Sequence, residues 1–411
     1  MKILVLAPDV PATSGMPGSP RLFNLCRELS QRHELFLLTY RSSQERYQTF
    51  LNDPATSHVF TRVEVLPDPP VVHWWGQQWH RLHLAAHFET RYRHAGYYRS
   101  IRERIRKLCV DERIDLIHVD LLAMIQYGDP QTNIPAIVDL HDSMTLLCRR
   151  MLNAERDWRK RLSAYLGLIS AKRLEGTLGK TFDLIITNST VDEQVIRELS
   201  PKPKTLTITN GVDMDYFSAT STVLEADKLV FTGVMDYAPN EDAALHFVED
   251  ILPLVRAKRP EVQFWIVGSG PSERVKALTR ISGVHVTGKV DDVRPYVRSA
   301  SVFVCPLRVG SGVKNKILAA MAMQKATVAT SMSIDGLDLA DNREVLLADD
   351  PQDFADKVVR LLTDQNAAHQ LGANGLARVQ GQYSWGAMGK VLETAIQSIM
   401  VSRNGRAHRV R

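Results

Sequence analysis

The stretch from Ser301 to Thr330 places the tightest limit on how this chain can fold. It opens on a short apolar run, Val302 to Cys305, passes through a glycine-containing turn, and continues with apolar residues at helical spacing. A second β-rich run, Ala326 to Thr330, closes it. A strand, a glycine turn, a helix and another strand in this order are typical of a parallel α/β sheet.

Three cations, Arg308, Lys314 and Lys316, lie close to the start of this expected helix, next to Gly310 and Gly312. The first amides of a helix have no partners within it and carry a partial positive charge, so the turn predicts a place to hold a phosphorylated ligand. A tight turn followed by solvated lysines is the alternative interpretation. The turn is neither a P-loop nor a dinucleotide fingerprint, because no Gly-Lys-Ser/Thr closes it and a third glycine is absent.

Strands and helices alternate along the rest of the chain, which predicts the α/β class with parallel sheets. The strand-like runs are residues 2–7, 34–39, 63–66, 115–119, 136–140 and 184–188 in the first half, and 229–232, 264–267, 285–287, 302–305, 327–330 and 345–347 in the second. A proline-broken polar stretch, 200–204, separates the two halves, and 411 residues suffice for two domains. We therefore expect one domain over 1–204, a second over 205–385, and a C-terminal helix with a frayed basic tail over 386–411.

Two other strand ends carry candidate functional residues. Gly15 and Gly18 follow the first strand, in a loop before a helix expected to start near Ser19, and ligands of open parallel sheets bind at such carboxyl ends. His141 and Asp142 follow the run 136–140. Flexible loop glycines, and a histidine satisfied by a local backbone contact, are the alternatives.

The composition, with 44% hydrophobic and 24% charged residues, is that of a soluble globular protein. The four cysteines are scattered and suit a reducing cytosol. No signal peptide or apolar run of membrane-spanning length is evident, so we expect a cytoplasmic protein. No Asp-x-Asp or similar metal-binding pattern stands out at a strand end, and no metal or cofactor is expected.

The net charge of +5 is unevenly distributed. The segment Val71 to Lys107 holds seven Arg and one Lys against two Glu, with six Trp and Tyr residues among them. Aromatic residues among cations favour an anionic membrane surface or an anionic acceptor, and a solvated helical hairpin is the alternative. Residues 154–179 also read as helical and basic. Nucleic acid is not expected as a partner, because no recognised nucleic-acid motif accompanies these stretches.

Four stretches resemble the GT-B glycosyltransferases, and in particular the retaining enzymes of glycosyltransferase family 4. They are SGMPGSPRLFNLCRELSQRHELFLLT, ITNGVDMDYF, LVFTGVMDYAPNEDAALHF and VHVTGKVDDVRPYVRSASVFVCPLRVGSGVKNKILAAMA. The segments TGVMDYAPN and PLRVGSGVKNK are similar to segments of the sugar transferases associated with bacterial exopolysaccharide and exosortase gene sets. The resemblance implies two Rossmann-like domains facing across a cleft, with the C-terminal helix crossing back to the first domain.

The resemblance also implies transfer of a sugar from a nucleotide-diphosphate donor to a glycan or lipid-linked acceptor, and it assigns roles to residues. The implied catalytic residues are His141, Asp142, Arg308 and Lys316. The implied donor-binding residues are Gly233, Asn240, Val290, Arg308, Gly310, Gly312, Lys314, Lys316 and Leu318. The implied acceptor-side residues are Gly15, Gly18 and Arg21.

One position departs from the family pattern. The family usually has two glutamates eight positions apart, and the second, which holds the nucleotide ribose, is replaced here by Ala319; neither Ser311 nor Val309 supplies the first. Loss of a charged hydrogen-bond acceptor costs about 1.5–3 kcal/mol of donor binding. Two other interpretations therefore stay open. One is a scaffold that does not bind the donor and partners an active transferase, and the other is a nucleotide-sugar epimerase of the same fold.

Overall fold

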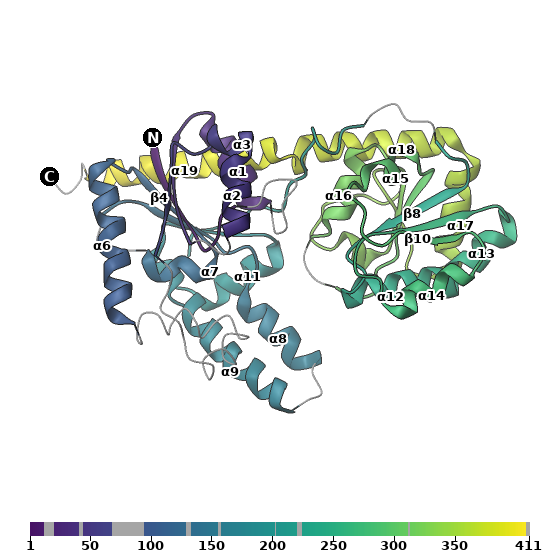
Figure 1. Cartoon of the computed structure of the whole chain (residues 1–411), viewed down its shortest axis with the longest axis horizontal. Helices are drawn as coiled ribbons and strands as arrows, with labels where there is room; N and C mark the ends of the chain where they lie inside the picture. Colours follow the sequence, from purple (N-terminus) through teal and green to yellow (C-terminus); the bar gives the residue numbers. More distant parts are fainter. Residues whose placement is uncertain are drawn as a thin grey trace. The chain divides into compact units, whose positions relative to one another are not determined.

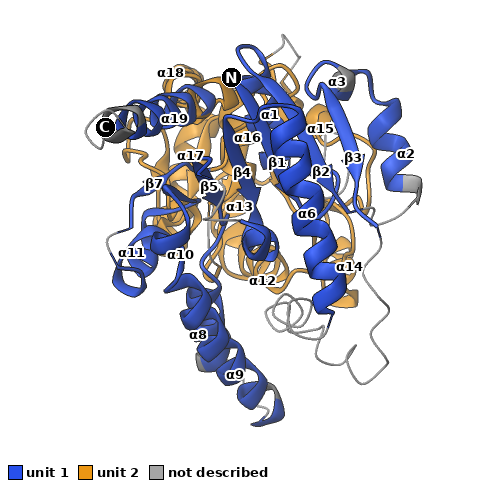
Figure 2. Cartoon of the chain, turned by 90° about the vertical axis from the view of Figure 1, so that its left-hand side faces the viewer, with its two compact units in different colours: residues 1–209, 389–411 blue, residues 210–388 orange. Residues whose placement is uncertain are grey.

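The computed structural model describes residues 1–11, 20–40, 44–67, 94–128, 133–154, 158–201, 203–219, 224–310 and 313–407. The chain forms two compact units, shown in Figures 1 and 2. Unit 1 consists of Met1–Thr209 and Gly389–Arg411, and unit 2 consists of Asn210–Met388. Each unit has its own parallel sheet and its own apolar core, as the alternating pattern of the sequence predicts.

The sheet of unit 1 has seven strands in the order β3-β2-β1-β4-β5-β6-β7, and all pairs are parallel. The chain winds outward in both directions from the neighbouring strands β1 and β4, so the connecting helices lie on both faces. The strands are β1 (Lys2–Ala7), β2 (Glu34–Thr39), β3 (Arg62–Val65), β4 (Leu116–Asp120), β5 (Ala136–Asp139), β6 (Leu184–Thr187) and β7 (Thr205–Thr207). The helices are α1 (Arg21–Ser30), α2 (Gln44–Asn52), α3 (Pro54–Ser57), α6 (Ala95–Asp111), α7 (Leu121–Met124), η1 (Ile125–Tyr127), α8 (Met144–Ala154), α9 (Trp158–Glu175), α10 (Leu178–Thr181) and α11 (Thr190–Leu199).

The sheet of unit 2 has six strands in the order β10-β9-β8-β11-β12-β13, again with parallel pairs. Here β8 and β11 are the neighbouring strands from which the chain winds outward. The strands are β8 (Lys228–Thr232), β9 (Gln263–Val267), β10 (Val284–Val286), β11 (Val302–Cys305), β12 (Thr327–Ala329) and β13 (Leu346–Leu347). The helices are α12 (Ala238–His246), η3 (Phe247–Ile251), α13 (Leu252–Lys258), α14 (Glu273–Ala277), η4 (Leu278–Arg280), α15 (Arg294–Ser299), α16 (Asn315–Ala322), η5 (Ser331–Ile334), α17 (Pro351–Thr363), α18 (Gln365–Arg378) and η6 (Val379–Tyr383).

The strand predictions hold because the central strands are apolar on both faces. All four residues of β11 are fully buried, and so are residues 3–7 of β1. A strand covered by helices on both sides needs such a continuous apolar run, rather than an alternating one. In the described part of the chain, no helix combines the length and apolarity needed to cross a membrane.

Three sequence-based boundaries need correction. Strand β7, which the expected boundary at residue 204 assigned to the second domain, pairs with β6 at the edge of the sheet of unit 1. Helix α1 begins at Arg21, with Pro20 at the N-cap position. The expected frayed tail is instead helical as far as Ala407, within the long helix α19 (Trp385–Ala407).

Helix α19 continues past the expected end because unit 1 holds it. Arg403 donates hydrogen bonds from Nε and Nη2 to the carboxylate of Asp183, at 3.1 and 3.0 Å, and from Nη1 to the Asn133 carbonyl at 2.7 Å. Nearer its start, Glu393 lies 2.6 Å from the His33 ring. These partners are far away in sequence, so local pattern could not reveal them.

Candidate functional site

In unit 2, the carboxyl ends of β8 and β11 meet at the point where the strand order reverses. Ligands of open parallel sheets bind at this point. Gly233 directly follows β8, and Arg308 and Gly310 lie in the turn after β11. The topology therefore gathers donor residues predicted from two separate stretches of sequence.

Lys316, in the first turn of α16, is the central cation of this site. Its Nζ donates a hydrogen bond to Asn240 Oδ1 at 2.6 Å and lies 4.3 Å from the centre of the Phe231 ring. Burial lowers the pKa of Lys316 to about 8. The ammonium is therefore poorly solvated and has one neutral partner, an arrangement in which an anion binds strongly.

Gly233 leaves the space that this arrangement needs. A Cβ atom on Gly233 would lie 2.8 Å from Asn240 Nδ2 and 3.0 Å from Lys316 Nζ. Asn240 is fixed by a second hydrogen bond, from its Nδ2 to the Val234 carbonyl at 2.8 Å. Gly268, with φ of +145°, packs against the Gly233 carbonyl, where a Cβ would come within 1.8 Å. Both positions therefore require glycine for close backbone approach.

Arg308 is half exposed and forms a two-pronged ion pair with Asp242 of α12. Its Nη2 lies 2.6 Å from Oδ1 and its Nε lies 3.0 Å from Oδ2. The pair lowers the pKa of Asp242. Arg308 thus reaches toward the end of β8, but its guanidinium is held by a carboxylate that the sequence analysis did not single out.

The structure describes four of the other five predicted donor residues, Gly310, Lys314, Val290 and Leu318. Gly310, with φ of +150°, adopts a conformation that favours glycine, and the Lys314 side chain packs beside it. Val290 follows β10 and packs partly against the core, whereas the Leu318 side chain is fully buried in it. Any donor contact of Leu318 would therefore have to come from its main chain. Gly312 lies outside the described residues.

In unit 1, His141 occupies the strand end next to β4. It has φ of +60°, a conformation that is uncommon and costly for a residue with a side chain. Its Nε2 lies 3.0 Å from Asp120 Oδ1, at the end of β4. Burial alone would lower the pKa of His141, but the charge and hydrogen bond of Asp120 outweigh it and raise this pKa. The structure thus favours a protonated imidazole beside a buried carboxylate.

Behind His141 lies a buried ion pair. Arg21, which is 1% exposed, donates from Nε to Asp139 Oδ2 at 2.8 Å and from Nη1 to the Ile208 carbonyl at 2.7 Å. Asp139 in turn accepts a hydrogen bond from the His141 amide at 3.3 Å. Burial would raise the pKa of Asp139, but Arg21 lowers it. Arg21 therefore supports the loop of His141, and its predicted contact with the acceptor is untested.

Asp142 lies at the surface beside His141, and desolvation together with the charge of Asp192 raises its pKa. Gly15 and Gly18 lie outside the described residues, so the loop after β1 adds nothing to the described site. Asp120, Asp139 and Asp242 are the site residues that the sequence analysis missed. Asp120 and Asp139 could have been found from the sequence, because each is a carboxylate at the end of an apolar, strand-like run.

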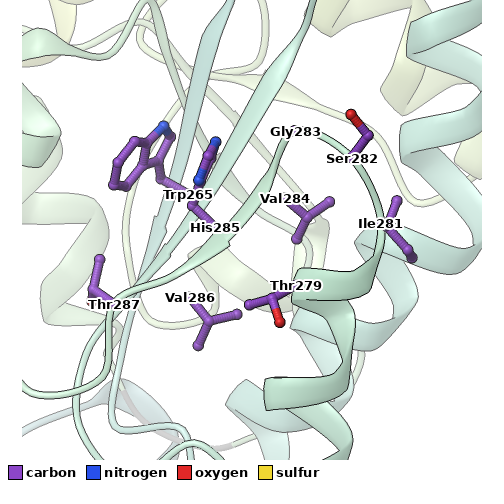
Figure 3. A pocket seen from close by; sticks show the side chains of 9 residues that line it. All are labelled: Trp265, Thr279, Ile281, Ser282, Gly283, Val284, His285, Val286 and Thr287. Carbon is purple, nitrogen blue, oxygen red and sulfur yellow. The ribbon is translucent and has the colours of Figure 1, made fainter.

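A pocket of about 380 Å³ lies elsewhere in unit 2, along the edge strand β10 (Figure 3). Trp265 stacks against His285 on its wall, with ring centres 4.3 Å apart. None of the described donor residues predicted from the sequence lines it. No group of three or more His, Cys, Asp or Glu side chains suited to a metal occurs among the described residues.

Two family descriptions match the chain. "Glycosyltransferase Family 4" matches residues 20–216, and "Glycosyl transferases group 1" matches residues 226–364. The first covers most of unit 1 and the first few residues of unit 2, and the second lies within unit 2. The two parallel sheets and these matches define a GT-B glycosyltransferase. Within that class, the chain belongs to the family 4-like enzymes.

The proteins similar to this chain include two transferases. A phosphatidyl-myo-inositol mannosyltransferase of Mycobacterium tuberculosis is 30% identical over 193 residues, which cover 43% of this chain and 50% of that protein. The capsular polysaccharide biosynthesis glycosyltransferase CapM of Staphylococcus aureus is 22% identical, over 54% of this chain and 63% of CapM. The match thus spans about half the length of the mannosyltransferase.

Solved structures confirm the fold. Sucrose-phosphate synthase from Thermosynechococcus elongatus has a TM-score of 0.66 at 18% identity and covers 98% of this chain and 100% of its own. Anabaena HepE in complex with UDP has a TM-score of 0.68 at 15% identity, over 97% and 100% of the two chains. At these identities the likeness establishes the GT-B fold and nothing about substrates.

Proposed function

We propose that this glycosyltransferase moves a sugar from a nucleoside-diphosphate sugar to a glycan or a lipid-linked acceptor, in the synthesis of bacterial exopolysaccharide or another cell-surface polysaccharide. The observation that carries the proposal is the poorly solvated ammonium of Lys316 beside Gly233 and Asn240, at the point where the strand order of unit 2 reverses. Anabaena HepE, solved in complex with UDP and with UDP-glucose, supports the donor class, and the capsular polysaccharide glycosyltransferase CapM supports the polysaccharide setting.

The diphosphate is the leaving group of such a transfer, and negative charge grows on it as the glycosidic bond breaks. Lys316 would lie against this charge in the first turn of α16, with Lys314 at the N-cap position of the same helix. Arg308 would exchange Asp242 for the diphosphate. Fixed charges of this kind are each worth about 2.7–4 kcal/mol of transition-state stabilisation. Because three cations balance the diphosphate, the proposal needs no metal ion, and activity should survive a chelator.

His141 is proposed to contact the transferred sugar. The carboxylate of Asp120 favours the protonated ring, and the positive φ of His141 is strain that the hydrogen bonds around the loop maintain. A protonated imidazole can donate a hydrogen bond to a sugar hydroxyl. Retention of configuration is part of the proposal through the family resemblance alone.

A panel of nucleoside-diphosphate sugars tests the donor site by thermal stabilisation. A ligand at about 100 times its dissociation constant adds about 2.7 kcal/mol to the free energy of unfolding. Release of free nucleoside diphosphate only in the presence of an acceptor identifies transfer, whereas product formation without an acceptor identifies an epimerase.

Ala319 is the one observation that favours a second function, that of a scaffold without donor binding. Its side chain lies partly buried in α16, where the family usually has a glutamate. Calorimetric titration with uridine, guanosine and adenosine diphosphates separates the two. No heat with any of them would favour the scaffold.

We also propose a peripheral position at the cytoplasmic face of a membrane, motivated by the basic aromatic segment 71–107. Residues 68–93 lie outside the described residues, and the remainder forms much of α6. Flotation with anionic vesicles at low and high salt tests this, and absence of binding at low salt would remove the membrane from the proposal.

A further inference from the structure

Helices α8 and α9 form a hairpin that carries a surface not used by the sites above. They are joined by three residues, pack against each other, and extend away from the sheet of unit 1 (Figures 1 and 2). Along α9, four large side chains are about half exposed or more: Trp158 at 68%, Leu162 and Tyr165 at 51%, and Ile169 at 49%.

These four residues form one continuous stripe. Their spacing of three and four residues places them on the same face of α9. Leu166 borders the stripe, and Leu147 and Met151, one turn apart, are exposed in the same way on α8. We call these seven residues the hairpin stripe. Along α9 the exposed apolar surface is contiguous, and a surface of this kind marks an interaction site.

The opposite face of α9 already packs against the protein, so the hairpin stripe is not a misplaced core face. Ala164, Leu168 and Ala171, at helical spacing, are buried there. Helix α9 is therefore apolar on two opposite faces. The inner face meets unit 1, and the outer face has no partner within the described chain.

Cations border the outer face on both sides. Counting around α9 at 100° per residue, Arg161 and Lys172 flank one side of the stripe, and Arg173 flanks the other. All three are exposed. Over residues 144–175 the sequence has eight Arg and Lys against three Asp and Glu, a net charge of 8 − 3 = +5. One of those acidic residues, Glu175, is fully buried.

The base of the hairpin is fixed beside His141. Glu175, at the end of α9, accepts hydrogen bonds from Ser143 Oγ at 3.0 Å and from the Met144 amide at 2.7 Å. The Ser143 amide donates to Asp192 at 2.8 Å. Because α8 starts three residues after His141, the hairpin has a defined position relative to the proposed sugar-contacting residue.

We propose that the hairpin stripe lies on an anionic membrane surface, with its apolar side chains in the headgroup region and the flanking cations against lipid phosphates. Apolar residues including Trp and Tyr, bordered by Lys and Arg, are the composition of helices that lie in the membrane interface. A second copy of the chain fits less well, since it would bring the same cations against one another. The inference rests on the proposed function in one respect: a lipid-linked acceptor would lie in that membrane.

Vesicle binding by the full chain, measured without nucleotide, tests the inference. The vesicles contain phosphatidylcholine alone or equal parts phosphatidylcholine and phosphatidylglycerol. We expect binding to the anionic vesicles, weakened about fivefold for each cation removed in Arg161→Gln and Arg173→Gln. Leu162→Gln with Ile169→Gln should weaken it by about tenfold or more.

Two control variants locate the surface. Val391→Gln with Val401→Gln replaces exposed apolar residues of α19, at 40% and 73% exposure, and should leave binding unchanged. Arg99→Gln with Lys107→Gln removes two cations from α6. Loss of binding in this variant, with full binding in the hairpin variants, would assign the membrane contact to the 71–107 segment and overturn the inference.

Trp158 provides a test that does not depend on a destabilising change. Anionic vesicles should shift tryptophan emission to the blue, and this shift should shrink in Trp158→Phe, which retains the apolar surface and should still bind. An unchanged shift in Trp158→Phe contradicts the inference. So does a self-association of the chain, seen by sedimentation without vesicles, that the Leu162→Gln/Ile169→Gln variant abolishes. Donor titration of the same variants keeps failure here distinct from failure of the transferase proposal.

Discussion

Lys316 Nζ and Asn240 Oδ1 lie 2.6 Å apart, although 76 residues separate them in the sequence. The hydrogen bond joins the first turn of α16 to α12 across the end of β8. It gives the ammonium one neutral partner where an exposed lysine would have several waters. An ammonium in this state gains more from a diphosphate than a solvated one does, because less hydration is lost when the ligand arrives.

Donor binding should depend on pH through Lys316. Its pKa is about 8 in the free protein, and an adjacent diphosphate would raise it. Below pH 8 the ammonium is already charged, whereas above it binding must include uptake of a proton. One pH unit above this pKa, donor affinity should be about tenfold weaker than well below it. Calorimetry in buffers of different ionisation enthalpy measures the number of protons taken up on binding. A number that does not increase as the pH rises through 8 would contradict the prediction.

The variant Lys316→Met should stabilise the free protein and abolish donor binding. The folded-state pKa of Lys316 is below its ordinary value of 10.5, so the charged form is disfavoured by folding. Replacement should add about 1–2 kcal/mol to the free energy of unfolding below pH 8, less than a fully buried lysine would give. This advantage should disappear as pH rises from about 8 toward 10.5. Urea unfolding at several pH values measures it, with Lys314→Met as the matched control.

Asp242 should compete with the donor for Arg308. The ion pair is largely exposed and worth about 0.2–1 kcal/mol, so Asp242→Asn should change stability little and tighten donor binding up to about fivefold. Arg308→Ala should lower turnover by about a hundredfold. In the Arg308→Ala background, Asp242→Asn should have no further effect on donor affinity. Equal tightening in both backgrounds would mean that the carboxylate acts by general repulsion.

Ala319→Glu should restore a charged acceptor for ribose hydroxyls. If the ribose pocket is otherwise intact, donor affinity should rise by about ten- to a hundredfold, corresponding to about 1.5–3 kcal/mol. Ala319→Gln, which supplies an oxygen without the charge, should give a smaller gain. Unchanged or weaker binding of both variants would show that another group has taken over the contact.

Asp120→Asn should lower the pKa of His141. Asp120 supplies the largest interaction that opposes burial, so without it the imidazole should titrate below its ordinary value of 6.5. The raised pKa of wild-type His141 contributes stability below pH 6.5, and this contribution is lost as pH rises through the folded-state value. The variant should lack that pH dependence. Titration of the His141 ring protons by NMR measures the pKa, and an unchanged value would exclude the proposed coupling.

The family resemblance and the apolar runs predicted the two parallel sheets, because a strand buried on both faces needs an uninterrupted apolar run whatever its neighbours are. The cations after β11 could also be predicted, since a glycine turn and the helix that follows it are local features. The predicted domain boundary was misplaced by one strand, because β7 is too short for its sequence to show which sheet it joins.

The local sequence determined which side chains stand at the strand ends. Only the tertiary structure decided what they contact: Arg308 pairs with Asp242, His141 with Asp120, and Arg21 with Asp139, each from a separate segment. The two apolar faces of α9 could likewise not be told apart until one was seen to be buried. The reason is physical, since a side chain's charge state and exposure depend on neighbours that folding brings from far along the chain.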